Sequence, residues 1–371
     1  MKADIAIIGA GIAGASLAAE VAGHASVLLI EAESRPGYHS TGRSAAFWSE
    51  TYGGPKVQPL TSASGLYLAD PPPDFAERPF LSPRGALHLA DRDGVTALDA
   101  LCAEFAGSAV PMKRLDRSKL EVLVPGLKPG WEQGALEPSC SDIDVGGLHA
   151  AYLKAARAKG VRIIANARVE RAKWADRHWQ LETRVGVVVA GVVVNAAGAW
   201  ADDVAIRAGA SPLGIQPYRR TIVQLRTDPA APGDLPLVID ALNRFYFKPE
   251  AGGRLWLSPH DETACPASDC APEEIDIALA IDRFQQVVDW KVERVEHSWA
   301  GLRSFAPDRL PVYGFDPVAP GFFWCAGQGG FGIQTAPAAA KLAAWLLLEQ
   351  TPNPLVAEID PSPYLAGRFR N

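Results

Sequence analysis

The apolar positions of the chain recur with the periods of strands and helices, and the pattern is clearest near the N-terminus. A continuous apolar run at 5–8 predicts a buried strand, and the small apolar residues of 15–22 predict a helix packed against it. A second apolar run at 26–30 predicts the next strand. Strand, helix and strand in this order are typical of a parallel α/β sheet.

Later segments carry patterns of both helices and strands. The predicted elements are a helix at 150–158, a strand at 161–165, a hairpin at 168–174 and 179–184, strands near 220–226, 245–248 and 255–258, an amphipathic helix near 273–290, and a final strand and helix at 322–326 and 336–348. The apolar stretch 185–201 contains glycines and Asn195, so we expect two short buried strands meeting around Ala190-Gly191 rather than a membrane span. The expected fold is α/β, or α+β overall, with one domain on a parallel sheet and a second on a mixed or antiparallel sheet.

A glycine pattern, G-x-G-x-x-G, lies between the first predicted strand and helix. Gly9 allows a tight turn, Gly11 lets a pyrophosphate approach the backbone, and Gly14 lets the helix pack on the strand. Glu31 ends the second strand, where a carboxylate can accept hydrogen bonds from a ribose diol. The pattern indicates a dinucleotide-binding unit; the alternative is a glycine-rich turn that binds nothing.

The composition narrows the class of protein. With 371 residues, 48% hydrophobic and 21% charged, the chain fits a globular enzyme of two domains. A net charge of −6 disfavours a nucleic acid as partner, and five cysteines without a C-x-x-C pair favour a reducing compartment and no metal site. The early first strand leaves no room for a signal peptide, so we expect a cytoplasmic protein without a transmembrane segment; peripheral attachment to the inner membrane through 336–348 is the alternative.

A second glycine-rich turn, Gly327 to Gly332, lies between the last predicted strand and helix. Backbone amides at such a helix entrance can stabilise the negative charge on the pyrimidine edge of a reduced flavin. The alternative is a surface loop without a ligand.

On these segments, the sequence resembles the D-amino-acid oxidase superfamily of FAD enzymes. The likeness is carried by the N-terminal glycine pattern, by 194–200 and by 327–332, while 36–46, 299–305 and 328–334 look like bacterial FAD-dependent D-arginine dehydrogenases. The resemblance implies non-covalent FAD bound by a Rossmann-like domain. The implied segments are 1–75, 140–205 and 300–371 for the FAD-binding domain, and 76–139 and 206–299 for the substrate domain.

The resemblance also implies which positions contact FAD. They are Gly9, Gly11, Ile12, Ala13, Gly14, Glu31, Ala32, Ser40, Thr41, Arg43, Ser44, Ala45, Ala46, Val169, Ala197, Gly198, Trp200, Gly301, Arg303, Gly329, Gly330, Phe331, Gly332, Ile333 and Gln334.

A smaller set matches the family's substrate positions. By resemblance, Tyr52, Arg220, Tyr246 and Arg303 hold the substrate carboxylate, and the carbonyl of Gly330 receives the amine. An arginine fork binds a carboxylate through two parallel hydrogen bonds, and tyrosine hydroxyls add further donors. The alternatives are that Arg219-Arg220 is a solvated pair, that Arg303 is a structural charge, and that both tyrosines are ordinary core aromatics.

Two positions depart from the D-arginine dehydrogenases. Phe47 stands where they have a histidine, and Ala86 stands where they have an acidic residue suited to a guanidinium. We therefore expect oxidative deamination of a D-amino acid with a neutral or apolar side chain. The electron acceptor, a quinone or oxygen, stays open.

Two other functions remain as alternatives. A 2-hydroxy-acid dehydrogenase on the same scaffold needs a base, for which His39, His260 and His297 are the histidines nearest the motifs. A flavin-binding redox sensor without turnover needs none.

Overall fold

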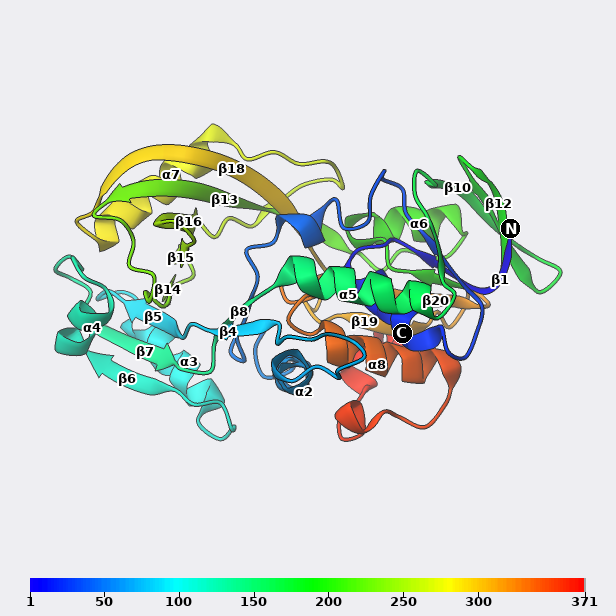
Figure 1. The fold of residues 1–371 in the computed structure, drawn as a ribbon, viewed down its shortest axis with the longest axis horizontal. Coiled ribbons are helices and arrows are strands. Elements are labelled where there is room, and N and C mark those ends of the chain that lie inside the picture. Colours follow the sequence, from blue (N-terminus) through cyan, green and yellow to red (C-terminus); the bar gives the residue numbers. More distant parts are fainter. Residues whose placement is uncertain (370–371) are drawn as a thin grey trace.

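The computed structural model describes residues 1–369 and shows an elongated molecule with a large sheet toward each end (Figure 1). The N-terminal strand β1 (Lys2–Ile8) and the long C-terminal helix α8 (Ala336–Leu348) belong to one half. Strands β5 (Ala86–Ala90) and β7 (Gln133–Glu137) belong to the other. The two halves give the fold class that the sequence predicts, a Rossmann-like domain and a second domain on a mixed sheet.

The first sheet is parallel around β1. This strand pairs in parallel with β2 (Val27–Ile30) and with β12 (Gly186–Asn195), and β12 pairs in parallel with β20 (Phe322–Ala326). The remaining strands are β9 (Arg162–Ile164), β10 (Val169–Ala175), β11 (His178–Thr183) and β19 (Val312–Phe315).

The prediction of two short strands around Ala190-Gly191 is wrong, because β12 is continuous. Its pairing with β1 runs through this point, from Lys2 opposite Val189 to Ile8 opposite Asn195. Gly191 lies close to the backbone carbonyl of β1, and a side chain there would crowd it. The glycine therefore permits close pairing rather than ending the strand.

Apolar residues cover both faces of the parallel sheet. Ile5 and Ile7 face the core beneath α1 (Ile12–Val21), α5 (Val145–Ala158) and α8, whereas the alternate residues Ala6 and Ile8 face a second core. That second core includes α6 (Ala201–Arg207) and the β10–β11 hairpin. Helix α1 begins at Ile12, three residues before the predicted start, because the turn at Gly9 leads directly into it.

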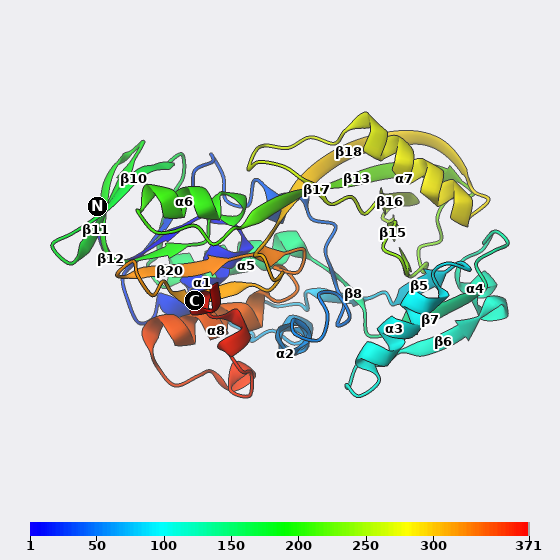
Figure 2. The same cartoon turned by 180° about the vertical axis from the view of Figure 1, so that it is seen from behind.

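The second sheet is mostly antiparallel. Its order is β21-β18-β13-β16-β15-β14-β5-β7-β6, with one parallel pair between β14 and β5. The strands not yet bounded are β6 (Lys113–Asp116), β13 (Gln216–Asp228), β14 (Leu237–Asp240), β15 (Tyr246–Glu250), β16 (Arg254–Ser258), β17 (Thr263–Ala264), β18 (Lys291–Phe305) and β21 (Gln328–Gly329). Figure 2 shows helix α7 (Glu274–Val287) covering the outer side of β13, β16 and β18.

The two faces of this sheet differ in what they contact. Val223, Phe247 and Leu257 face the apolar core under α7. The alternate residues Ile222 and Tyr246 face the other way, toward the first domain, in a cluster with Ala86. This inner face carries the residues expected to bind substrate.

Shorter elements connect the two halves. Strands β3 (Phe47–Trp48), β8 (Ser141–Ile143) and β4 (Leu81–Pro83) form a small sheet between them. The other elements are α2 (Gln58–Ala69), α3 (Val95–Phe105), α4 (Arg117–Leu123), and the 3-10 turns η1 (Ser40–Arg43), η2 (Gly198–Trp200), η3 (Pro354–Val356), η4 (Ser362–Tyr364) and η5 (Ala366–Phe369). The predicted domain boundary at residue 300 falls inside β18, which continues to Phe305.

Within residues 1–369, none of the helices has the length and apolar character needed to cross a bilayer.

Candidate active site

A cavity of about 240 Å³ lies between the two domains. One end lies at the carboxyl ends of β1 and β2, next to Gly9 and Glu31. The other end reaches the inner face of the second sheet at Arg220, Ile222 and Arg303. A dinucleotide lying along it would reach both regions.

Most of the positions expected to contact FAD line this cavity. They are Gly9, Gly11, Ile12, Ala13, Glu31, Ala32, Ser40, Thr41, Arg43, Ser44, Val169, Ala197, Gly198, Trp200, Gly301, Arg303, Gly329, Gly330, Gly332 and Ile333. Gly14, Ala45, Ala46, Phe331 and Gln334 lie outside its lining.

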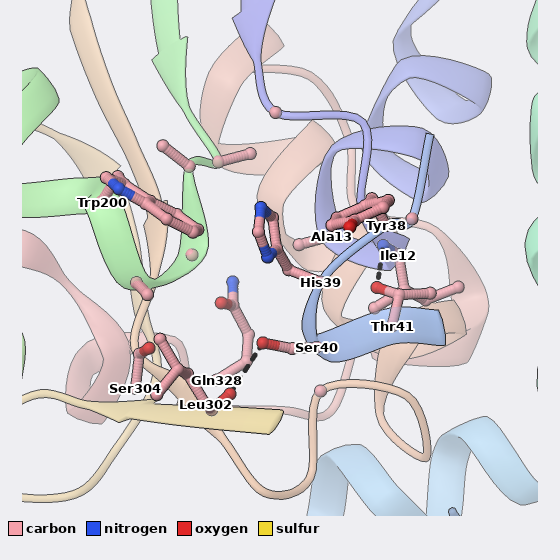
Figure 3. Close-up of a pocket in the computed structure, with 18 of the residues that line it drawn as sticks. Ile12, Ala13, Tyr38, His39, Ser40, Thr41, Trp200, Leu302, Ser304 and Gln328 are labelled. Carbon is pink, nitrogen blue, oxygen red and sulfur yellow. Dashed lines mark hydrogen bonds between the residues drawn. The ribbon is translucent and has the colours of Figure 1, made fainter. Parts of the chain in front are cut away.

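The glycine loop is built for close approach of backbone to backbone. Gly9 has a φ of 103°, and a Cβ there would clash with the carbonyl of Ala196. A Cβ at Gly14 would clash with the carbonyl of Gly9, so Gly14 packs the helix on the turn as expected and does so away from the cavity. The Ile12 amide donates to Thr41 Oγ1 over 3.0 Å, a contact drawn in Figure 3. The start of α1 is thereby fixed beside the cavity.

Glu31 lies at the other side of this loop and is 8% exposed. Its Oε2 accepts a hydrogen bond from the Ala10 amide and its Oε1 from the Glu33 amide, each over 2.9 Å. Each carboxylate oxygen can accept a second hydrogen bond, so the side chain can also receive a ribose diol. The position fits the predicted role, and the internal bonds also fix the glycine loop.

Several lining residues lie beside the predicted ones but were not among the positions expected to contact FAD. They are Tyr38, His39, Leu302, Ser304 and Gln328, all labelled in Figure 3. The His39 ring lies 4.6 Å from the ring of Trp200, centroid to centroid, and Ser40 Oγ donates to the Leu302 carbonyl over 2.7 Å. Four of these residues lie inside the 36–46 and 299–305 motifs, so membership of those motifs was the sequence signal that could have predicted them.

Arg43 borders the cavity, and its guanidinium is also bound by other parts of the chain. Its guanidinium donates to the carbonyl oxygens of Cys270 (3.0 Å) and Ala300 (3.3 Å) and pairs with Asp269. Tyr38 Oη also donates to Asp269, over 3.2 Å. Arg43 therefore anchors the segment before α7 against the first domain while its side chain borders the cavity.

The strand register explains why Arg220 and Arg303 meet. Arg303 on β18 lies opposite Tyr218 on β13, and Arg220 lies two residues further along β13. Side chains two apart share a face of the sheet, so the two arginines are diagonal neighbours on the inner face. Both line the cavity.

The two arginines differ in what they already bind. Arg220 is 3% exposed, its Nε donates to the Asp261 carbonyl over 2.7 Å, and its Nη2 donates to Glu262 Oε1 over 3.1 Å. In the part of the chain that the structure describes, the buried Nη1 of Arg303 has no hydrogen-bond partner. Arg303 is thus the arginine with more capacity for an incoming carboxylate.

Burial, together with the neighbouring Arg303, lowers the pKa of Arg220. The expectation that Arg219-Arg220 could be a solvated pair is wrong. Arg219 is buried as well, and its Nη2 donates to Asp276 Oδ2 over 2.9 Å.

Tyr52 and Gly330 are in direct contact. A Cβ added at Gly330 would overlap the Tyr52 hydroxyl and would lie 3.2 Å from Arg303 Cδ. Gln334, expected to contact FAD, instead donates to the carbonyl oxygens of Ser49 and Tyr52, each over 3.1 Å. Gln334 therefore holds the backbone that presents Tyr52.

A buried carboxylate supports the same turn. Glu137 accepts hydrogen bonds from Ser49 Oγ (2.9 Å), the Glu50 amide (2.7 Å) and Thr51 Oγ1 (2.7 Å). Burial raises the pKa of Glu137, but the nearby His88 imidazole, with Nε2 3.9 Å from Oε2, and the hydrogen bonds from Thr51 and Ser49 lower it overall. Nothing in the sequence pattern marks this residue, because its partners come from a distant segment.

Tyr246 and the two predicted specificity positions, Phe47 and Ala86, form one apolar cluster, here called the apolar wall, and none of the three belongs to the cavity lining. Ala86 is 0% exposed and belongs to the cluster of Tyr246 and Ile222, with Phe47 packed against it. The Phe47 ring lies 5.6 Å from that of Tyr52 and 6.1 Å from that of Tyr246, centroid to centroid. Both tyrosine rings pack in apolar clusters, as the alternative reading expected, and their hydroxyl edges lie near the arginines.

Of residues 1–369, no group of three or more His, Cys, Asp or Glu side chains is arranged to hold a metal ion.

The fold and the cavity define a dinucleotide-binding enzyme whose second sheet presents a buried cationic site. The family model "FAD dependent oxidoreductase" matches residues 4–346, and the chain belongs to this family. FAD is therefore its cofactor. The glycine loop, Glu31 and a cavity lined by both domains fit that molecule.

Individual relatives are distant. The chain is 26% identical over 274 residues to the hydrogen cyanide synthase subunit HcnC of Pseudomonas aeruginosa. The aligned region covers 73% of this chain and 63% of that protein. It is 30% identical over 199 residues to FAD-dependent oxidoreductase domain-containing protein 1 of Mus musculus, covering 48% of this chain but only 39% of that one. The chain thus spans less than two thirds of both these relatives.

Two solved structures share the fold over nearly the whole chain. Glycine oxidase from Geobacillus kaustophilus superposes with a TM-score of 0.85, 24% identity and 98% coverage of both chains. L-proline dehydrogenase from P. horikoshii superposes with a TM-score of 0.83, 23% identity and coverage of 98% and 99%.

Proposed function

We propose that this FAD-dependent oxidoreductase oxidises the Cα–N bond of a D-amino acid with a neutral or apolar side chain. The observation that carries the proposal is Arg303, whose buried Nη1 has no partner within residues 1–369, beside Arg220 and two tyrosines. A buried guanidinium without a partner is costly, and a ligand carboxylate removes that cost. Relatives named for oxidising glycine and L-proline support an α-amino acid as the substrate class.

In the proposed complex, Arg303 binds the carboxylate through its fork, with Tyr52, Tyr246 and Arg220 as further donors. The Gly330 carbonyl accepts a hydrogen bond from the amine. Bound FAD supplies the acceptor for the hydride that leaves Cα. The nitrogen lone pair forms the C=N bond as the hydride leaves, an N–H proton passes to solvent, and water converts the imino acid to a 2-oxo acid and ammonia.

The charges of the site favour a neutral amine. Arg220 and Arg303 disfavour an additional positive charge, and the bound carboxylate partly offsets them. The clamp fixes Cα relative to the flavin, and such orientation contributes several kcal/mol, about 7 or more in favourable intramolecular cases.

The apolar wall supports the side-chain preference. Phe47 and Ala86 offer no partner for a cationic side chain, whereas each buried methylene of an apolar one gains about 0.8 kcal/mol. The D configuration rests on the resemblance to the D-amino-acid oxidase superfamily.

An anaerobic screen of D- and L-amino acids and 2-hydroxy acids tests the proposal, with bleaching of the flavin absorbance as the signal. We expect the fastest bleaching with neutral or apolar D-amino acids. Faster reduction by L-amino acids or by 2-hydroxy acids would overturn the D-amino-acid assignment, and no reduction by any of them would favour the sensor. Re-oxidation of the reduced protein with oxygen or with a quinone then separates the two electron acceptors.

A further inference from the structure

One histidine, His260, packs against Tyr246 of the proposed clamp and lies outside the lining of the cavity. His260 follows β16 by two residues and has a φ of 55°, a left-handed conformation that costs energy in most residues other than glycine. Its backbone amide donates to Ser258 Oγ over 3.1 Å, which fixes the turn. The turn brings the imidazole edge to face against the Tyr246 ring, with centroids 5.6 Å apart and planes at 84°.

His260 shares its surroundings with two other unsatisfied groups. Within the described residues, His260 Nδ1, Tyr246 Oη and Arg303 Nη1 are buried and have no hydrogen-bond partner. They come from three separate segments but interact electrostatically. After burial, the charges of Arg220 and Arg303 lower the pKa of His260, and Tyr246 acts to raise the pKa of Arg303. Buried polar atoms are normally paired, so this gathering indicates a ligand that pairs with them.

The protonation of the ring follows from its surroundings. Burial, followed by the charges of Arg220 and Arg303, lowers the pKa of His260 to about 2, so the imidazole is neutral. The backbone of Asn243 also favours the protonated form of the ring, as a nearby carbonyl does. Since Nδ1 has no partner in residues 1–369, the ring nitrogen on the Asn243 side is Nε2. A neutral imidazole has a single N–H, so Nδ1 presents a lone pair.

The Nδ1 lone pair of His260 can accept a hydrogen bond from only one kind of ligand group, a donor. Carboxylate oxygens carry no hydrogen, so they cannot pair with Nδ1 and are bound by the arginine and tyrosine donors instead. The group of an α-amino acid that can donate to Nδ1 is its amine. We propose that His260 Nδ1 accepts a hydrogen bond from the substrate α-amine and thereby positions it, which neither the motif analysis nor the family resemblance assigns.

This inference rests on the proposed amino-acid function and deepens it. A neutral amine has two N–H groups, so His260 Nδ1 and the Gly330 carbonyl can each accept one. The ring is too weak a base to remove a proton near neutral pH, so it orients the amine without taking its proton.

Two variants and a control test the inference on the FAD-loaded protein. His260→Phe keeps the ring edge against Tyr246 but has no acceptor, and His260→Asn places an amide oxygen near Nδ1 and tolerates a positive φ. His297→Phe changes an exposed histidine that stacks on Trp299 and, among the described residues, is not one of those with a buried unpaired atom. The probes are the best amino acid of the screen and the same acid with the amine replaced by hydrogen.

We expect His260→Phe to raise the dissociation constant of the amino acid on the order of tenfold. The dissociation constant of the acid without the amine should change by about twofold or less. His260→Asn should recover part of the loss, and His297→Phe should resemble the unmodified protein. Equal weakening of both probes, or no weakening of either, would overturn the role of His260. Failure of every amino acid to reduce the unmodified protein would instead overturn the proposed function, and the two outcomes are distinguishable.

Discussion

Arg303→Lys is the most direct test of the proposed carboxylate clamp. Arg220 already donates through Nε and Nη2 to Asp261 and Glu262, so Arg303 is expected to supply the two parallel bonds to a carboxylate. A lysine keeps the charge but replaces the planar fork with a single point donor. Losing one charge-assisted bond costs about 1.5 to 3 kcal/mol, and the displaced ammonium adds desolvation, so we expect about 3 kcal/mol in kcat/KM, or roughly 100-fold.

Steady-state kinetics and anaerobic flavin reduction with the best substrate of the screen measure this effect. Arg254→Lys is the matched control, because Arg254 pairs with Glu296 on the same sheet and does not border the cavity. It should change kcat/KM less than twofold. Arg220→Lys should lose less than Arg303→Lys. Near-normal kcat/KM for Arg303→Lys, with intact FAD binding, would refute the clamp.

Four further outcomes follow from the same site. Denaturing precipitation should release yellow FAD into the supernatant; colour retained by the polypeptide would contradict non-covalent binding. Gly330→Ala should lower kcat/KM at least about tenfold, because its Cβ overlaps the Tyr52 hydroxyl, while Gly233→Ala, where a Cβ meets no atom within 4 Å, should behave as the unmodified protein; equal activities would disprove the contact. Ala86→Glu should shift the kcat/KM ratio toward D-arginine or D-lysine over apolar D-amino acids and lower Tm, since it buries a carboxylate beside Glu137 on the adjacent strand; an unchanged ratio would remove Ala86 from the specificity wall. The folded pKa of His260 lies below its unfolded value of 6.5, at about 2, so the unfolded chain takes up a proton that the folded chain does not, and stability is lost as pH falls from 6.5 toward about 2. Between about pH 7 and about pH 5, the free energy of unfolding of His260→Asn should therefore fall about 2 kcal/mol less than that of the unmodified protein, as measured by urea unfolding. The same pH dependence for both proteins would contradict the neutral His260 ring.

The nucleotide-binding half could be predicted from sequence because its determinants are local. The glycines at 9, 11 and 14 and the acid at 31 lie within one strand-helix-strand unit, and the structure forms that unit with the expected turn. Helix α8 has the predicted bounds, since Pro337 near its start and the end of the apolar run mark both ends. The predicted turn at 327–332 begins with the short strand β21, and one continuous turn over 330–335 then leads into the helix at Ala336.

The substrate end could not be derived from local pattern. Arg220 and Arg303 become neighbours only through the register between β13 and β18, and alternation within one strand gives no information about that register. Tyr52 reaches them from a third segment, held by Glu137 and Gln334. Family resemblance supplied these positions, whereas the residues alone showed only that each was chemically suitable.

Side-chain direction was the least predictable feature, and the hydrogen bonds explain why. Arg43 and Glu137 are polar groups near the cavity that other parts of the chain satisfy, so they serve to hold loops in place. Arg303, Tyr246 and His260 have buried polar atoms that residues 1–369 leave unpaired. Each such atom costs about 1 to 3 kcal/mol. Tyr152 Oη and Tyr313 Oη are also buried and unpaired among the described residues, in the core of the first domain, so it is the shared location of the three atoms that points to a ligand. Their shared location places the cost where a substrate carboxylate and amine would remove it.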